Sequence, residues 1–313
     1  MGAWKILLTD GLEENGQAIM RKSAEVDDRG GISADELLQV VGEYDAIIVR
    51  GRTKVTPAVF DAGKKLKVVG RSGVGVDNID LAAAKQHGVT VVNAPVATSI
   101  AVAELAFGMM LALVRELPRA DASMKNGKWL KKEMEGTEVY GKTLGVVGFG
   151  RIGSNVAQRA AAFGMKILAY DPLLSPEEIQ KRGGEPVTLD QLYANSDFIT
   201  LHVPLSSETR GMINAETFNK MKKGVRVICA ARGGVIDEAA LLAALESGQV
   251  AGAGLDVFAT EPPGQTALIS HPRVVATPHV GAQTIEAQQR AAGDIGTEVL
   301  AALQGSALRW KVA

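Results

Sequence analysis

Short apolar runs that end in polar or glycine-rich turns recur along the 313 residues of this chain. In the first third, each run has the length of a buried strand, and helix-like segments separate the runs. The runs are Lys5–Thr9, Ala46–Val49, Val68–Gly70 and Thr90–Val92. The helices between them are expected at Leu12–Met20, at Ser33–Val41, from Thr56 onward and at Leu81–His87. This alternation predicts a doubly wound α/β domain with a parallel sheet.

Helix signals add detail to this pattern. Ser33 precedes Glu36 by three residues, which is the spacing of a capping box. The apolar stretch that begins at residue 100 contains one acid and is shorter than a membrane span, so we expect a buried helix over about 100–117. Residues 118–142 are polar and rich in lysine, and a last long helix is expected over 284–303.

The second half of the chain opens with a nucleotide-binding pattern. The apolar run Leu144–Val147 leads into Gly148-Phe-Gly-Arg-Ile-Gly153, which has the G-x-G-x-x-G spacing. A helix-like segment, Ser154–Phe163, and a second apolar run, Lys166–Tyr170, follow, and Asp171 stands 18 residues after the last glycine. Strand, glycine turn, helix, strand and acid together predict a dinucleotide site. The alternative is a glycine-rich turn in an α/β protein that binds nothing.

Each part of this pattern has a physical function. Gly148 allows the tight turn, Gly150 lets a diphosphate approach the backbone, and Gly153 lets helix and strand pack closely. The helix N-terminus offers N–H groups and the positive end of a dipole to the phosphates. Asp171 can accept hydrogen bonds from ribose hydroxyls and would repel a 2′-phosphate, and Pro172–Leu174 offers no cation to bind one. The sequence therefore favours NAD over NADP.

Three ionisable residues follow apolar runs of the second half and could carry chemistry at one sheet edge: Arg232, Glu261 and His279. Histidine can transfer a proton near neutral pH, a carboxylate beside it stabilises the imidazolium, and arginine can bind a carboxylate and polarise a carbonyl. We expect reduction of a ketone, or the reverse oxidation, with the hydride carried by the nicotinamide. The alternative is that all three lie in ordinary turns and loops.

The other histidines have plainer interpretations. His202 ends an apolar run and is expected to be structural, His87 precedes a glycine at a helix C-terminus, and His271 precedes a proline in a loop. Four scattered histidines without an H-x-x-x-H pair make a metal site unexpected.

A second candidate cluster lies in the first domain. Arg50, Arg52, Lys54 and Arg71 flank the glycine-rich segment Ser72-Gly73-Val74-Gly75. Backbone N–H groups of such a segment can bind a carboxylate, and Arg50 could reach a phosphate. The alternative is a solvated basic loop.

Composition narrows the possible classes of function. Hydrophobic residues make up 46% of the chain and charged residues 22%, and the net charge is −1, which gives no basic field for nucleic acid or an anionic membrane. The single cysteine, Cys229, excludes a disulfide framework and is expected in the core. The N-terminus lacks the apolar length of a signal peptide, so a cytoplasmic location is expected.

These residues and motifs together resemble the D-isomer-specific 2-hydroxyacid dehydrogenases over nearly the whole chain. The motifs that carry the resemblance are Val49–Thr56, Val69–Asp80, Ser123–Trp129, Gly148–Gly153, Tyr170–Pro172, Lys222–Val227, Ala231–Glu238, Leu255–Phe258, Glu261–Pro263 and Pro278–Ala282. The resemblance is strongest to the branch that oxidises 3-phospho-D-glycerate, in a short form without C-terminal regulatory domains.

The resemblance implies a set of site residues. Arg232, Glu261 and His279 would be catalytic, and Arg50 with Ser72, Gly73, Val74 and Gly75 would bind an anionic hydroxy-acid substrate. The NAD site would comprise Gly148, Gly150, Arg151, Ile152, Gly153, Asp171, Val203, Ala230, Ala231, Arg232, Asp256, His279, Gly281 and Ala282. Thr98, Val74 and Val203 depart from the residues usual in the family.

The resemblance also implies the architecture. A flavodoxin-like substrate domain would comprise residues 1–97 and 285–313, and a Rossmann-type NAD domain residues 98–284, in a homodimer or homotetramer. The expected activity is NAD-dependent oxidation of 3-phospho-D-glycerate to 3-phosphooxypyruvate. Alternatives are a glyoxylate or hydroxypyruvate reductase and, in a different class, a corepressor-like NAD sensor.

Overall fold

The computed structural model describes residues 4–313, which divide into two compact units. Unit 1 combines the described residues up to Ser99 with Ala282–Ala313, and unit 2 is the continuous segment Ile100–Gly281. The family resemblance implies limits after residues 97 and 284, whereas the two compact units divide after Ser99 and Gly281. Each unit contains one parallel sheet, so the chain is an α/β protein with two such sheets.

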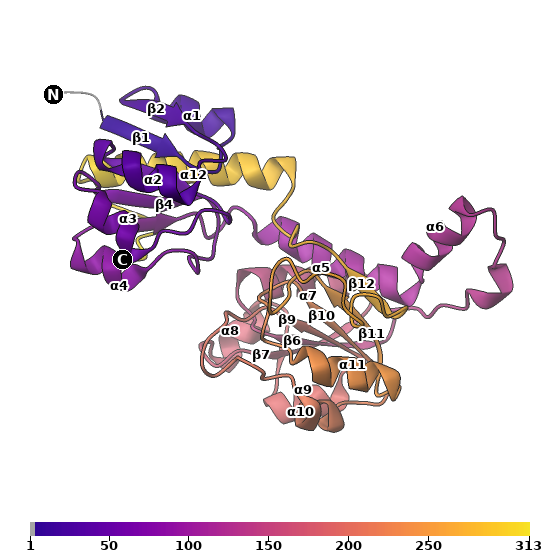
Figure 1. Ribbon diagram of the computed structural model, residues 1–313. Helices are drawn as coiled ribbons and strands as arrows, with labels where there is room; N and C mark the ends of the chain where they lie inside the picture. Colours follow the sequence, from indigo (N-terminus) through magenta and orange to yellow (C-terminus); the bar gives the residue numbers. More distant parts are fainter. Residues whose placement is uncertain (1–3) are drawn as a thin grey trace. The chain divides into compact units, whose positions relative to one another are not determined.

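Unit 1 is built on a five-stranded sheet in the order β2-β1-β3-β4-β5 (Figure 1). The strands are β1 (Trp4–Leu8), β2 (Ala24–Asp28), β3 (Ala46–Val49), β4 (Val68–Arg71) and β5 (Thr90–Asn93). The helices are α1 (Glu14–Met20), α2 (Ala34–Val40), α3 (Pro57–Ala62), α4 (Leu81–Gln86) and α12 (Ile285–Leu303), with a 3-10 turn η1 at Val41–Glu43. Buried side chains of α1 and α12 contact one face of the sheet and those of α2, α3 and α4 the other.

Helices α1 and α12 approach each other closely enough to require glycine. A Cβ added at Gly16 of α1 would lie 2.5 Å from the carbonyl oxygen of Ala292 in α12. The side chains of Ile295 and Val299, also in α12, fill the space beside Gly70 of β4. The C-terminal helix is therefore part of the core of the N-terminal sheet.

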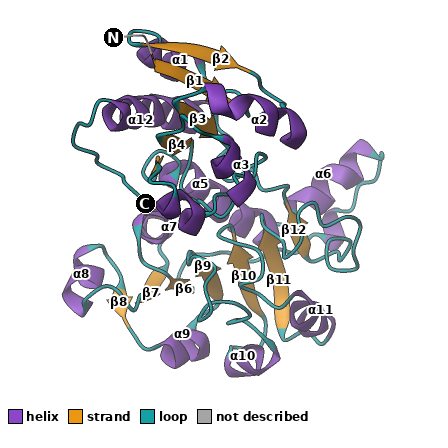
Figure 2. Ribbon diagram, turned by 60° about the vertical axis from the view of Figure 1, so that its left-hand side comes forward, coloured by secondary structure: helices purple, strands orange, loops and turns teal. Residues whose placement is uncertain are grey.

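Unit 2 is built on a seven-stranded sheet in the order β12-β11-β10-β9-β6-β7-β8 (Figure 2). The strands are β6 (Thr143–Val147), β7 (Lys166–Tyr170), β8 (Glu185–Pro186), β9 (Phe198–Leu201), β10 (Val225–Cys229), β11 (Val250–Leu255) and β12 (Val274–Ala276). The helices are α5 (Ser99–Val114), α6 (Leu117–Lys125), α7 (Arg151–Ala162), α8 (Pro176–Lys181), α9 (Leu189–Asn195), α10 (Ala215–Lys220) and α11 (Glu238–Glu246). Helices α5 and α7 cover one face of the sheet, and α9, α10 and α11 cover the other.

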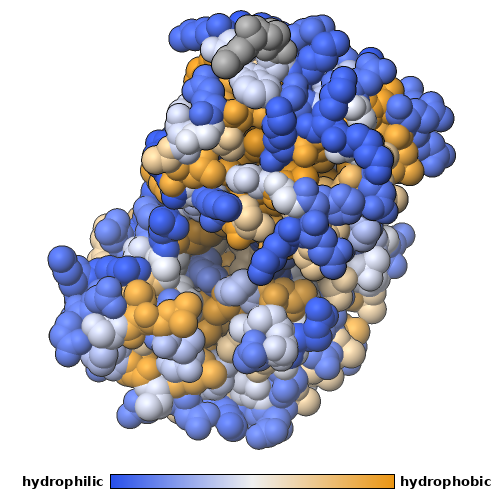
Figure 3. Space-filling view, turned by 90° about the vertical axis from the view of Figure 1, so that its left-hand side faces the viewer, coloured by the Kyte–Doolittle hydropathy of each residue, from blue (hydrophilic) through white to orange (hydrophobic). Residues whose placement is uncertain are grey.

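Polar residues cover much of one face of the molecule (Figure 3). On the face drawn in Figure 3, hydrophilic residues in blue surround smaller areas of hydrophobic residues in orange. Among residues 4–313, no helix is long and apolar enough to cross a membrane. The apolar stretch at residue 100 instead forms the buried helix α5, as expected from its sequence.

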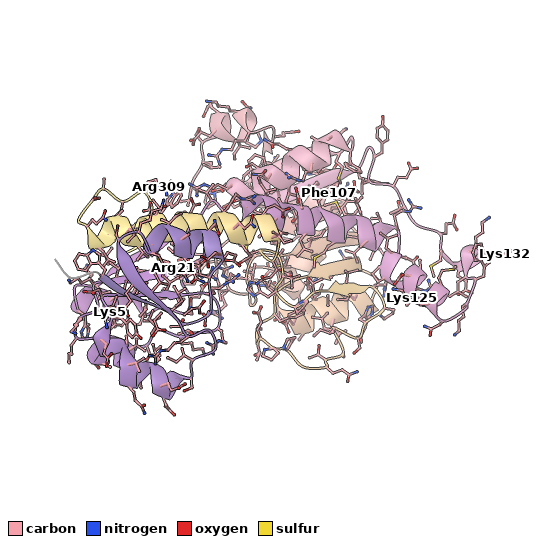
Figure 4. The ribbon with its side chains drawn as sticks, turned by 90° about the horizontal axis from the view of Figure 1, so that it is seen from above. Lys5, Arg21, Phe107, Lys125, Lys132 and Arg309 are labelled. Carbon is pink, nitrogen blue, oxygen red and sulfur yellow. The ribbon has the colours of Figure 1, made fainter. Side chains whose placement is uncertain are left out.

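The segment after α5 differs from the expectation. The helix expected to reach Leu117 ends at Val114, and Glu116 adopts a left-handed backbone with φ 47°. Residues 118–142, described from sequence only as polar, contain α6 and a 3-10 turn, η2 (Lys131–Glu133). We call residues 117–138 the arm. It carries no buried side chain in either helical element, and it extends away from the sheet of its own unit, with Lys125 and Lys132 at its two helical parts (Figure 4).

Candidate active site

The glycine turn connects β6 to α7 with the geometry that its spacing predicts. Gly148 has φ +87°, and a Cβ there would lie 2.5 Å from the carbonyl oxygen of His202. A Cβ on Gly153 would overlap the carbonyl oxygen of Gly148, whereas a Cβ on Gly150 would meet no atom within 4 Å. Two glycines thus permit close backbone packing, and the third leaves open space at the N-terminus of α7. This arrangement fits a dinucleotide diphosphate.

Asp171 follows β7 and lies against this turn. Its Oδ2 accepts a hydrogen bond from the N–H of Phe149 at 2.8 Å, and its Oδ1 accepts one from the N–H of Leu173 at 2.9 Å. Each carboxylate oxygen has two lone pairs, so Asp171 can also accept from ribose hydroxyls. The acid therefore anchors the glycine turn in addition to its expected contact with the cofactor.

His279 and Glu261 form a hydrogen-bonded pair in unit 2. His279 Nδ1 lies 2.7 Å from Glu261 Oε2, and the two side chains are 49% and 36% exposed, so a substrate could reach them. The other carboxylate oxygen, Oε1, accepts from the N–H of Phe258 at 3.0 Å and fixes the position of the acid. With Nδ1 directed at the carboxylate, Nε2 is the ring nitrogen that can exchange a proton with a substrate.

Asp256 organises the loop that carries His279. It follows β11, is 1% exposed, and its Oδ1 accepts from Thr277 Oγ1 at 2.5 Å and from the N–H of Val280 at 2.8 Å. Its Oδ2 accepts from the N–H of Gly281 at 2.8 Å, and its backbone carbonyl accepts from the N–H of His279. His279 has φ 53°, which is uncommon for a residue other than glycine, and these bonds hold that backbone in place.

Arg232 lies on the loop after β10, the strand next to β11. Its Nη1 donates to the carbonyl of Ala231 at 2.6 Å. The next residue, Gly233, touches the backbone of Phe258, since a Cβ on Gly233 would overlap that residue's carbonyl oxygen. The arginine loop is thus packed against the loop that ends in Glu261. All three expected catalytic residues come from the carboxyl ends of neighbouring strands, where ligands bind in open parallel sheets.

Sequence reasoning missed two supporting residues. Glu238, at the start of α11, accepts from the N–H of Ala259 at 2.6 Å and so supports the loop before Glu261. Thr277 binds Asp256 as described above. Glu238 belongs to a motif shared with the resembled family, but neither residue has a spacing that indicates its partner. Only the folded backbone brings these pairs together.

The remaining residues expected at the cofactor lie around the same edge of unit 2 or just beyond it in the chain. Arg151 and Ile152 begin α7, Val203 follows β9, Ala230 and Ala231 follow β10, and Gly281 and Ala282 follow His279, with Ala282 the first residue of the second segment of unit 1. Within residues 4–313, no group of three or more His, Cys, Asp or Glu side chains is arranged to hold a metal ion.

His202 is partly buried, with its Nδ1 fully shielded from solvent, and Cys229 is buried. His202 Nε2 lies 2.9 Å from Thr200 Oγ1, and burial lowers the pKa of the imidazole to about 4. Cys229 is 2% exposed, and burial raises the pKa of its thiol to about 11. The burial of Cys229 confirms the expectation of a core cysteine. Its thiol is a poor nucleophile because it stays protonated.

In unit 1, the loop that carries Arg50 is held by two side chains. Asp10 accepts from the N–H groups of Arg50 and Thr53 at 2.7 and 3.1 Å, and Asn78 donates to the carbonyls of the same two residues. The Arg50 guanidinium lies 3.3 Å from Glu13 Oε1. The carboxylate of Glu13 therefore lies beside Arg50, the residue that was expected to bind the phosphate of the substrate.

The segment Ser72–Gly75 offers fewer backbone donors than the sequence suggested. The N–H of Ser72 donates to Val49 and that of Gly73 to Arg71. Within the described part of the chain, no backbone hydrogen bond uses the N–H of Val74 or Gly75. An anion at this segment would therefore be bound by these two amides.

Known proteins resemble the chain over nearly all of its length. A D-3-phosphoglycerate dehydrogenase of Synechocystis sp. is 50% identical over 301 residues, which cover 96% of this chain and 54% of that protein. One of Rattus norvegicus is 47% identical over 305 residues, 97% of this chain and 57% of that protein. The chain thus spans about half the length of these curated relatives.

Solved structures show the same fold. A glyoxylate reductase from Paecilomyes thermophila is 31% identical, with a TM-score of 0.91 over 100% of this chain and 99% of that one. The family model "D-isomer specific 2-hydroxyacid dehydrogenase, NAD binding domain" matches residues 107–281, which include the glycine turn, Asp171 and all three expected catalytic residues. Unit 2 therefore contains the NAD-binding domain of that family, and the chain belongs to the D-isomer specific 2-hydroxyacid dehydrogenases.

Proposed function

We propose that this chain catalyses the NAD-dependent oxidation of 3-phospho-D-glycerate to 3-phosphooxypyruvate, the first step of L-serine biosynthesis. The observation that carries the proposal is the 2.7 Å contact between His279 and Glu261 in an NAD-binding domain. The names of the two relatives at 47–50% identity support the choice of substrate within the family.

In the proposed mechanism, His279 accepts the proton of the substrate hydroxyl at Nε2, because Nδ1 faces Glu261. Glu261 stabilises the imidazolium that forms, and Arg232 binds the substrate carboxylate and polarises the oxygen that becomes a carbonyl. Bound NAD⁺ supplies the hydride acceptor. The overall products are the keto acid, NADH and one proton, which His279 releases to solvent.

The substrate contacts that we propose lie in unit 1. Arg50 would bind the phosphate, and the amides of Val74 and Gly75 the carboxylate, with Ser72 and Gly73 shaping the segment. For the phosphate to bind, it must displace Glu13 from Arg50. The rigid backbone of the Arg50 loop supports this role, because Asp10 and Asn78 leave only the side chain free to change partner.

We also propose the finer fold and site assignments that the family resemblance implies. The strand order β8-β7-β6-β9-β10-β11 corresponds to the order 3-2-1-4-5-6 of a Rossmann-type domain, and unit 1 has the flavodoxin-like order 2-1-3-4-5. NAD would contact the glycine turn, Asp171, Asp256 and the other cofactor residues named above, while unit 1 would bind the substrate.

The arm supports a further proposal, assembly into a homodimer or homotetramer through unit 2. Leu117, Met124 and Trp129 of the arm are 53%, 56% and 76% exposed. Arg119 pairs with Glu133 at 3.2 Å and so connects the two helical parts of the arm that carries these apolar side chains. A second copy of the chain would bury them.

A glyoxylate or hydroxypyruvate reductase is the second candidate, and the contact between Glu13 and Arg50 favours it. A carboxylate 3.3 Å from the arginine opposes the binding of a phosphate dianion, whereas glyoxylate carries no phosphate. The solved glyoxylate reductase is also similar over the full length of this chain.

Kinetics with paired substrates test the proposal. We expect Arg50→Gln to raise KM about tenfold or more for 3-phospho-D-glycerate and to leave KM for D-glycerate unchanged, since one charge-assisted contact is lost. Lys54→Gln, an exposed cation of the same loop, is the matched control. Equal effects on both substrates, or a wild-type preference for glyoxylate with NADH, would contradict the proposal.

A second comparison separates an enzyme from an NAD sensor. His279→Ala is expected to abolish turnover and to keep NADH binding, because the proton acceptor is lost while the glycine turn is intact. A wild-type protein that binds NADH but turns over none of these substrates would support the sensor.

A further inference from the structure

Phe149 lies in the middle of the glycine turn, and both its N–H and its carbonyl form hydrogen bonds with side chains. The residue is fully buried, and its N–H donates to Asp171 Oδ2 at 2.8 Å. Its carbonyl oxygen accepts a hydrogen bond from Arg182 Nη1 at 3.0 Å. Asp171 is part of the nucleotide pattern, but Arg182 lies 33 residues after Phe149 and has no place in that pattern.

The sequence around α8 explains why Arg182 reaches the turn. A capping box between Ser175 and Glu178 fixes the start of the helix, and Ile179 anchors it in the core. Arg182 is the C-cap residue, and a Cβ on the nearby Gly184 would lie 2.8 Å from the ring of Phe149. The segment that follows α8 therefore contacts Phe149 twice: the backbone of Gly184 lies against the ring, and the guanidinium of Arg182 donates to the carbonyl.

Holding this carbonyl sets the direction of the next N–H group. The peptide between Phe149 and Gly150 is trans, so the N–H of Gly150 points away from the carbonyl oxygen that Arg182 binds. Gly150 is the N-cap of α7, and the space beside its Cα contains no protein atom within 4 Å of an added Cβ. If the peptide rotated, its oxygen would turn toward the diphosphate and repel it.

We propose that Arg182 is a positioning residue for NAD: its bond to the Phe149 carbonyl holds the peptide that directs the Gly150 N–H at the cofactor diphosphate. Arg182 acts through the backbone of the turn and touches neither the substrate nor the ribose of the cofactor. The inference rests on NAD binding by unit 2 and does not depend on which hydroxy acid is the substrate.

Arg182→Met tests the role, because methionine retains an apolar stem and removes the donor. We expect the Kd for NADH, measured by fluorescence titration without substrate, to rise about tenfold, the usual effect of losing one hydrogen bond to a charged group. At saturating NAD, kcat and KM for the hydroxy acid should change less than about twofold. Arg182→Lys should recover most of the affinity, because its ammonium can donate to the same carbonyl.

Lys181→Met, at the exposed neighbouring position, is the matched control and should bind NADH like the wild type. An unchanged Kd in Arg182→Met would overturn the proposal. So would a changed preference between NAD and NADP, which would place the guanidinium at the ribose. A fall in the melting temperature of the cofactor-free protein with an equal rise of both KM values would show a merely structural role and would also overturn it.

Discussion

At the residue scale, the candidate active site depends on backbone geometry as much as on side chains. The identities of Arg232, Glu261 and His279 could be proposed from sequence, because each follows a strand of a parallel sheet. The left-handed conformation of His279 could not be predicted, because the hydrogen bonds that hold it come from Asp256, 23 residues earlier in the chain. Arg182 escaped sequence reasoning for the same reason, since long-range bonds to backbone atoms leave no local pattern.

His202 gives a prediction about stability and pH. Desolvation of its partly buried imidazole lowers the pKa to about 4, below the ordinary value of 6.5. As the pH falls below 6.5, His202 binds a proton in the unfolded chain but not in the folded protein. The free energy of unfolding is therefore unaffected by the protonation of this histidine above pH 6.5 and decreases as the pH falls from 6.5 toward 4. We expect His202→Gln to lose less free energy of unfolding than the wild type between about pH 7.5 and pH 5, measured by urea denaturation.

The control for this prediction is His271→Gln, which changes a loop histidine that lies outside the core. It should follow the wild-type curve. Identical pH dependence in the wild type and His202→Gln would mean that His202 is protonated in the folded protein.

At the scale of elements, periodicity predicted the buried strands well because their apolar runs are continuous. The bounds of β3 and β7 match the expectation, and the capping box at Ser33 is confirmed. The pattern missed β2, whose sequence Ala-Glu-Val-Asp-Asp contains few apolar residues because it is an edge strand and pairs with β1 alone. It also missed α6, which buries no side chain and so has no apolar face to detect.

The contact between α1 and α12 gives a prediction at this scale. Gly16→Ala adds a Cβ that would lie 2.5 Å from the carbonyl oxygen of Ala292, so the helices must separate. We expect a loss of about 2 kcal/mol in the free energy of unfolding, the usual cost of overpacking, measured by chemical denaturation. Gly51→Ala, where an added Cβ meets nothing within 4 Å, is the control. Equal free energies of unfolding for the two variants would show that α1 and α12 can separate without a loss of stability.

At the scale of the whole molecule, sequence periodicity alone showed two sets of strands but not that the chain returns to its first sheet. That expectation came from the family resemblance, since a long amphipathic helix at residue 285 does not reveal which sheet it covers. In the structure, the side chains of Ile295 and Val299 lie against Gly70 of β4, so this helix covers the first sheet.

The arm gives a prediction about assembly. Trp129 of the arm is 76% exposed, and we expect a second copy of the chain to cover it. Trp129→Glu should halve the mass measured by light scattering during gel filtration and leave the circular dichroism spectrum unchanged, because a charge opposes burial in an apolar interface. Lys128→Glu introduces the same acid one residue earlier and should keep the wild-type mass. A monomeric wild type would exclude the proposed interface.

The return of α12 to the first sheet has a consequence for how the protein is made. Residues 4–99 are translated before residues 285–303, but one face of their sheet is fully covered only when α12 has joined α1 on it. The intervening unit is contiguous and can reach its native state as soon as its own last strand emerges. During synthesis, unit 1 therefore completes its folding after unit 2, and part of its apolar sheet face stays exposed until α12 has been made.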